Sequence, residues 1–135
     1  MKRLYEKQFE EICQRYQITQ NEVDIIAFLA NNPGFDTAKD IAEMRMIAKS
    51  YISKSVEKLI KKGFLVRISD KEDRRMIHLQ LTGKANPVID SARLKQKEFI
   101  EILFAGMDAD EIKTFESLLD KIFDNANKTT DKRGI

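Results

Sequence analysis

Charged side chains are concentrated in one short stretch of the sequence, SDKEDRRMIHLQL, which runs from Ser69 to Leu81. Its adjacent arginines, Arg74 and Arg75, follow a run of acids and lysine and precede a segment of alternating apolar and polar residues. A guanidinium carries five N–H donors in a planar fork, which suits phosphate oxygens. Asp73 is close enough in the chain to hold one guanidinium in a bidentate pair and to orient it. The stretch therefore predicts a turn that binds an anion.

The segments on either side of this turn indicate which anion it meets. FLVRI (64–68) and MIHLQL (76–81) have the composition and alternation of strands, so we expect an antiparallel hairpin. The tip of such a hairpin can enter the minor groove of DNA, which is electronegative over A·T-rich sequence and attracts arginine. Asp70 and Glu72 are expected to shape the turn by bonds from side chain to backbone. An ordinary solvated turn is the alternative.

A second group of charged residues lies on one side of a predicted helix, AKSYISKSVEKLIKK (48–62). At about 100° per residue, one face of this helix carries the apolar side chains Ile52, Val56, Leu59 and Ile60. The other side carries Ser50, Lys54, Lys58 and Lys61, with Tyr51, Ser53 and Glu57 beside them. Hydroxyl and ammonium groups can bond base edges and phosphates in a major groove. A solvated helix face is the alternative, and Glu57 is expected to pair with Lys61.

The remaining elements are predicted from their caps and apolar periodicity. TQNE (19–22) reads as a capping box, and the helix that it opens should end at NNPG (31–34). Thr37 should cap a short helix over 38–45, with Ile41, Ala42 and Met44 facing a core, and Gly63 should close the 48–62 helix. Asn86 is expected to cap a helix with Pro87 in its first turn, and a last helix should begin at DADE (108–111). The tail from residue 127 is expected to be frayed.

These elements predict a fold that is mainly α with a small β-hairpin. Two short helices joined by a tight turn form a helix-turn-helix, and the hairpin adds a wing. We expect one domain over 1–135, in which 19–82 form the winged helix-turn-helix and 1–17 and 84–125 form helical arms for dimerisation. The winged module accounts for a minority of the chain, so the arms need a role of their own.

The composition is that of a globular protein with a basic centre. The 135 residues are 42% hydrophobic and 34% charged, and the formal net charge is +2. From Thr37 to Thr82, eleven lysines and arginines stand against six aspartates and glutamates, which gives +5 there and −3 for the flanks. A local excess of positive charge favours a polyanion as the partner. No apolar run approaches membrane-spanning length, so a cytoplasmic protein without membrane contact is expected.

The central sequence resembles the MarR (multiple-antibiotic-resistance regulator) family of bacterial transcription factors. The segments that carry the resemblance are AKSYISKSVEKL, KKGFLVR, DKEDRR and LQLT, all within residues 48–82. The resemblance implies a homodimer built from the first and last two helices, double-stranded DNA with a palindromic operator as the target, and repression relieved by a small effector such as a phenolic or other apolar anion. This sequence departs from the family pattern in two places. Ala48 stands where a capping Ser or Asp is common, and the N-terminal helix is short.

Carried over by position, the resemblance gives the residues that would contact DNA. On the helix these are Lys49, Ser50, Tyr51, Ser53, Lys54 and Lys58. On the wing they are Asp73 and Arg75, with Arg74 as their neighbour. Residues of an effector pocket are not assigned, because the phenylalanines and methionines at helical spacing also suit a core or a dimer interface.

The sequence gives little support to catalysis or to a bound cofactor or metal. It has no Ser/His/Asp set, no phosphate-binding glycine loop and a single histidine, His78, for which a surface or phosphate-contacting role is expected. Cys13 is the single cysteine, and core packing is a better interpretation than peroxide sensing because no second thiol exists. The rival to a DNA reader is a winged-helix module that binds an acidic protein.

Overall fold

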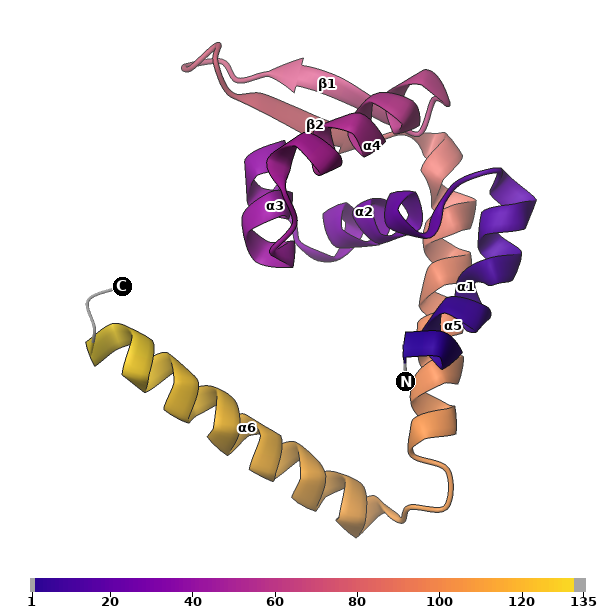
Figure 1. Cartoon of the computed structure of the whole chain (residues 1–135), viewed down its shortest axis with the longest axis vertical. Coiled ribbons are helices and arrows are strands. Elements are labelled where there is room, and N and C mark those ends of the chain that lie inside the picture. The colour runs from indigo at the N-terminus through magenta and orange to yellow at the C-terminus, as the bar shows by residue number, and fades with distance from the viewer. Residues whose placement is uncertain (1, 133–135) are drawn as a thin grey trace. The chain divides into compact units, whose positions relative to one another are not determined.

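The computed structural model describes residues 2–132 and confirms the predicted order of elements (Figure 1). The helices are α1 (Lys2–Tyr16), α2 (Gln20–Asn31), α3 (Ala38–Arg45), α4 (Lys49–Lys61), α5 (Asn86–Leu103) and α6 (Ala109–Lys132). The strands are β1 (Leu65–Ser69) and β2 (Ile77–Leu81), and a short 3₁₀ helix, η1 (Gly83–Ala85), precedes α5. The chain divides into two compact units, Met1–Phe99 and Ile100–Ile135. Among the described helices, none is both long and apolar enough to cross a membrane.

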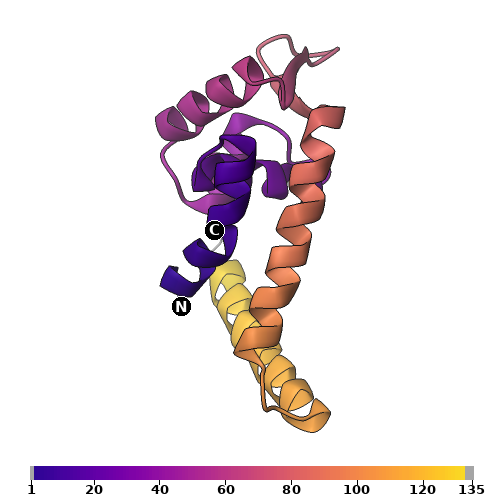
Figure 2. The same ribbon diagram turned by 90° about the vertical axis from the view of Figure 1, so that its right-hand side faces the viewer.

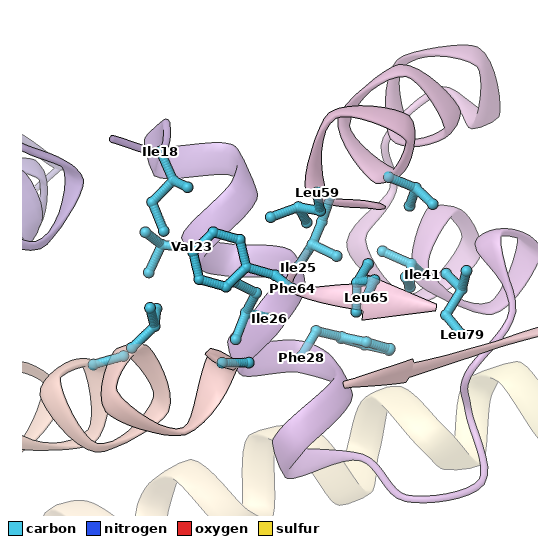
Figure 3. Close-up of a cluster of buried hydrophobic side chains, with 14 of the residues drawn as sticks. Ile18, Val23, Ile25, Ile26, Phe28, Ile41, Leu59, Phe64, Leu65 and Leu79 are labelled. Atoms are coloured by element: carbon cyan, nitrogen blue, oxygen red, sulfur yellow. The ribbon is translucent and has the colours of Figure 1, made fainter. Parts of the chain in front are cut away.

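The core of the first unit is built around α2, which contributes Val23, Ile25, Ile26 and Phe28 (Figure 3). Helices α1 and α4 and strand β2 all pack on α2, so α2 is covered on more than one side. Helix α1 also runs beside α5, as Figures 1 and 2 show from two directions. Tyr5 of α1 meets the ring of Phe99 edge-on at 5.5 Å between centroids. The core therefore joins the winged module to the N-terminal arm.

The helix-turn-helix consists of α3, a tight turn and α4. Thr37 caps α3 as predicted, and Asp40 completes a capping box with it. Ile41 and Ala42 are buried as expected, but Met44 is exposed, so its assignment to the core was wrong. The turn between the helices places Met46 in the left-handed region, with φ +55°, which ends α3 and turns the chain toward α4.

The wing is the predicted antiparallel hairpin. Its register pairs Leu65 with Leu81 and Ser69 with Ile77. Gly63 has φ +86°, a conformation that glycine adopts without strain, and it closes α4 before the chain enters β1. Leu65 and Leu79 are buried at the base of the hairpin, where they attach the wing to the core.

Two helix boundaries differ from the sequence prediction. Asn86 is already helical, with φ −55° and ψ −46°, and is therefore not the N-cap that was predicted. The helical path begins at Gly83, in the 3₁₀ turn that the Ala85 amide closes by donating to the Thr82 carbonyl. The Ala85 side chain is buried, which anchors this turn to the core. The last helix opens with a capping box between Asp108 and Glu111 and continues to Lys132, so residues 127–132 are helical and not an irregular tail. The part of the predicted tail from residue 133 on lies outside the described residues.

A buried ion pair fastens the start of α2 to the end of α4 and gives a stability prediction. The Glu22 carboxylate is 1% exposed, and its two oxygens each accept from Lys62 Nζ at 3.0 Å. In Lys62→Met, the Thr19 amide would be the one donor left to this carboxylate among the described residues. Because the lysine side chain is 35% exposed, the loss should be smaller than for a fully buried pair, about 2 kcal/mol in the free energy of unfolding.

Urea unfolding at pH 7 measures this loss. Lys61→Met is the matched control, since Lys61 is exposed on the same helix and its replacement should change the free energy of unfolding by no more than about 0.5 kcal/mol. Equal losses in the two variants would show that the Glu22–Lys62 pair does not stabilise the fold.

Candidate nucleic-acid interface

Helix α4 presents a polar face to solvent, as its periodicity predicts. Ile52, Val56 and Leu59 are buried, and Ser55 is held against α2 by a hydrogen bond from Asn21 Nδ2 at 2.9 Å. The predicted contact residues are all exposed: Lys49, Ser50, Tyr51, Ser53, Lys54 and Lys58. Ala48 occupies the N-cap position without a side-chain bond, which confirms that this helix lacks its usual cap. The first amides of α4 are therefore left to other acceptors.

Glu57 pairs with Arg67 of β1, and the predicted pair with Lys61 was wrong. Lys61 is a neighbour of Glu57 on the helix itself, whereas the hairpin brings Arg67 alongside α4. Both partners are about half-exposed, so the pair adds little to stability. Its consequence for the surface is that the one acidic side chain on the outer side of α4 is neutralised by the wing.

The tip of the wing is organised around Asp73, which orients Arg75. Asp73 Oδ1 accepts the backbone amide of Arg75 at 3.0 Å and its Nε at 3.4 Å. The prediction of an oriented guanidinium is confirmed, but both bonds go to one oxygen, so the expected bidentate pairing was wrong. The Arg75 side chain remains 94% exposed, which leaves most of its guanidinium accessible. Arg74 is exposed beside it.

The turn itself is shaped by Asp70. Its Oδ2 accepts the amides of Glu72 and Asp73 at 3.0 and 2.9 Å, and its Oδ1 lies 2.8 Å from Nε2 of His78. The bond from His78 and then the two amides lower the pKa of Asp70 to about 2, so this carboxylate is ionised at neutral pH. Glu72 contributes its amide, and within the described chain its carboxylate makes no such bond, contrary to expectation.

His78 keeps part of its side chain at the surface, as expected, but both of its ring nitrogens are bonded to carboxylates, which does not favour the predicted phosphate contact. Its ring is partly buried, with Nδ1 2.6 Å from Asp36 and Nε2 2.8 Å from Asp70. A ring enclosed by two carboxylates is poorly placed to meet a phosphate. The contact with Asp36 could not be predicted from the sequence, because the two residues are 42 positions apart.

Cys13 packs against the core, which agrees with the structural interpretation made from the sequence. Burial raises the pKa of its thiol, and the negative charge of Asp24 raises it further. Oxidation by peroxide requires the thiolate form, which a raised pKa disfavours. The raised pKa therefore favours the packing role of Cys13 over peroxide sensing.

The helix and the wing meet at a groove of about 500 Å³. Its lining includes Lys49 from α4, Asp73 and Arg75 from the wing, and Lys39 from the first turn of α3. A second hollow, of about 540 Å³, is bordered by Tyr51, Lys54 and Lys58 together with the first turn of α2. Six of the nine predicted residues thus line one or the other of these two hollows, whereas Ser50, Ser53 and Arg74 line neither. Lys39 was missed by the sequence reasoning, although a lysine in an exposed first turn was a usable signal.

Comparisons with known proteins place this architecture in a family. A model described as "MarR family" matches residues 16–76, which extend from the end of α1 to the tip of the wing. The uncharacterised HTH-type transcriptional regulator YwaE of Bacillus subtilis is 29% identical over 94% of this chain and 74% of its own length. The chain belongs to the MarR family. Members of the MarR family are winged helix-turn-helix transcriptional regulators, so this protein is a regulator of that class and not an enzyme.

Solved MarR structures agree with the fold. A MarR protein from Peptoclostridium difficile superposes with a TM-score of 0.77, covering 97% of this chain and 85% of its own, at 23% identity. Streptococcus pneumoniae FabT, solved in complex with DNA, superposes with a TM-score of 0.66 over 83% of this chain and 78% of its own, also at 23% identity. The MarR-type winged helix with N- and C-terminal helices is therefore the fold of this chain.

Proposed function

We propose that this MarR-family protein is a homodimeric repressor of a palindromic DNA operator. Each subunit would place α4 in the major groove of one half-site and its wing in the adjacent minor groove. The observation that carries the proposal is that Lys49 of α4 and Arg75 of the wing line one groove, so that both can hold the same stretch of DNA backbone. The two α4 helices of the dimer should lie about 34–36 Å apart, or a multiple of this.

The dimer is supported by apolar side chains that the second unit leaves exposed. Helix α6 carries exposed Phe115, Leu118, Leu119, Ile122 and Phe123. They fall within an arc of about 140° on the helix, which is the width of a packing face. Exposed apolar residues that form one continuous face mark an interaction surface. We assign dimerisation to residues 1–17 and 84–125 and DNA contact to residues 19–82.

Repression is proposed because a dimer bound across a palindrome occupies DNA that a polymerase needs when the site overlaps a promoter. We further propose that a small phenolic or other apolar anion relieves the repression, and that the protein acts in the cytoplasm, where its DNA is. A promoter–reporter fusion assayed with and without candidate anions tests both points. Reporter expression should be low with the protein alone and should rise with the effector.

DNA binding is separated from the rival function, an interface for an acidic protein, by its dependence on salt. If Lys49, Arg75 and their neighbours neutralise phosphates, the logarithm of affinity for duplex DNA should fall linearly with the logarithm of salt concentration. The slope should be about −0.9 for each phosphate neutralised. An absence of duplex binding even at low salt would favour the protein-binding module.

The residues of α4 should determine which sequence is bound. Lys54 is exposed at the centre of the outer face, where its ammonium can reach a guanine edge. In Lys54→Ala, the cost of a mismatch at one base pair of each half-site should fall by about 1–3 kcal/mol. Lys39→Ala is the matched control, because a phosphate contact from α3 should weaken binding to all sequences alike. Competition with single-base operator variants measures both effects, and an unchanged preference in Lys54→Ala would contradict the assignment.

A further inference from the structure

His78 connects the wing to the body of the winged module. It lies on β2, opposite Ile68 of β1. Its Nδ1 is 2.6 Å from Asp36 Oδ1, in the loop between α2 and α3, and its Nε2 is 2.8 Å from Asp70 Oδ1, at the end of β1. The Leu79 amide also donates to the Asp36 carbonyl at 2.8 Å. We call Asp36, His78 and Asp70 the His78 clasp.

The protonation state of the clasp follows from its hydrogen bonds. Ionised carboxylates only accept hydrogen bonds, and both ring nitrogens of His78 face carboxylate oxygens at bonding distance. Both nitrogens can donate only when the ring is an imidazolium, because neutral imidazole has one N–H. Loss of one proton would therefore leave a ring nitrogen and a carboxylate oxygen facing each other as two acceptors.

The clasp is linked to the DNA-facing arginine through a short series of bonds. Asp70 uses one oxygen for His78 and the other for the amides of Glu72 and Asp73. Asp73 in turn accepts from the backbone amide and Nε of Arg75. The position of the Asp70 carboxylate thus determines the path of the turn that presents Arg75.

We infer that protonated His78 is a positioning residue for DNA binding, which holds Asp70 against Asp36 and so fixes the wing turn that carries Asp73 and Arg75. The inference rests on the proposed function to the extent that Arg75 is taken to contact DNA. Its consequence is that the affinity for DNA falls as His78 loses its proton.

The direction of the pH dependence follows from the charges around the ring. The bond with Asp36, then that with Asp70, raises the pKa of His78 above its ordinary value near 6.5. The clasp is therefore complete below about pH 6.5 and is lost as the pH rises through the raised pKa. Other charged groups on the elements packed against β2 have their own partners: Lys39 with Glu43, Asp40 with Thr37, Arg67 with Glu57, and Asp24 with Arg45.

The first test needs no DNA. His78 is the one histidine of the chain, so the imidazole signals in an NMR titration report its pKa without ambiguity. We expect a pKa above 6.5 in the wild type and a lower value in Asp36→Asn, which has the same shape without the charge. Heteronuclear NOE values of the Glu72 and Asp73 amides should fall between pH 6 and pH 8.5 in the wild type. In His78→Gln, both N–H donors are on one amide nitrogen, which cannot take the positions of both ring nitrogens, so the NOE values should be low at both pH values.

The second test measures the affinity for the selected operator duplex by fluorescence anisotropy over the same pH range. Loss of one hydrogen bond predicts an affinity about three- to tenfold weaker at pH 8.5 than at pH 6 in the wild type. His78→Gln should be weakened at pH 6 and nearly independent of pH. Asp36→Asn is the decisive control. If the phosphates of DNA alone favour the imidazolium, the affinity of this variant should depend on pH as strongly as that of the wild type. If the clasp acts, the pH dependence of the variant should be smaller.

The outcomes separate this inference from the proposed function. Operator binding that is equally pH-dependent in the wild type and in Asp36→Asn, or independent of pH in the wild type, would overturn the role of His78 while leaving DNA binding intact. If no duplex is bound at any pH, the proposed function fails, and the NOE values decide whether the clasp orders the wing. In that case too, wing amides that are equally ordered at pH 6 and pH 8.5 would overturn the role of His78.

Discussion

Arg75→Ala should weaken binding to every duplex about tenfold for each half-site, and so about 100-fold for a dimer. A hydrogen bond to a charged group contributes about 1.5–3 kcal/mol, and 1.4 kcal/mol corresponds to a factor of ten in affinity. Arg75 is the wing residue whose guanidinium Asp73 orients, and it is almost fully exposed at the tip. Because the contact is to phosphate and to the minor groove, specific and random sequences should lose affinity together. Gel-shift titrations with the operator and with a scrambled duplex measure both losses.

Arg74→Ala is the matched control for this experiment. It removes the same charge from the adjacent position, where no carboxylate orients the guanidinium in the described structure. Its effect on affinity should be several-fold smaller, although both variants should reduce the salt dependence. If Arg75→Ala leaves the affinity unchanged, the wing does not contact DNA as proposed.

Ile122→Glu should convert the dimer into a monomer and reduce the affinity for the operator about 100-fold or more. Ile122 lies in the middle of the apolar face of α6 and is 62% exposed in the single chain. In a dimer that covers this face, the substitution would bury an unpaired carboxylate, which costs several kcal/mol. In a dimer, binding of one subunit holds the second subunit near its own half-site, which raises the affinity about 10²–10⁴-fold. A monomer loses this gain. Light scattering coupled to size-exclusion chromatography measures the mass, and a gel shift measures the affinity.

Ser117→Glu adds the same charge on the opposite side of α6, about 170° from the centre of the apolar face. Ser117 is exposed, and this variant should remain dimeric with normal operator affinity. If Ile122→Glu is still a dimer at micromolar concentration, the subunits associate through another surface.

The features that the sequence predicted best are those governed by neighbouring residues. The capping box at Thr19 and the left-handed glycine that ends α4, Gly63, depend on residues within a few positions, and both are present. The buried face of α4 follows from its periodicity, and the oriented Arg75 follows from an aspartate two residues away. Local chemistry of this kind is written directly in the sequence.

The features that the sequence failed to predict depend on how distant elements meet. Glu57 turns to Arg67 because β1 returns alongside α4, which the helical wheel could not include. His78 finds Asp36 across 42 positions, and neither residue has a motif that points to the other. Met44 has core spacing but lies on the exposed side of α3, since a helix of only 8 residues can bury few positions. The position of Lys39 beside the wing also depends on the contact of α3 with β2, although its place in an exposed first turn was a usable signal.

Selection of a random duplex library against the purified protein shows whether it reads a DNA sequence, and a gel-shift titration of the enriched duplex measures how tightly it binds. A homodimeric operator reader should enrich a palindrome whose half-site centres are about 10 base pairs apart, or a multiple, and two subunits should bind it. Binding should be about 10³-fold or more tighter than to random duplex. A library that shows no enrichment, with only weak and sequence-independent binding, would contradict the proposal that this MarR-family protein reads an operator.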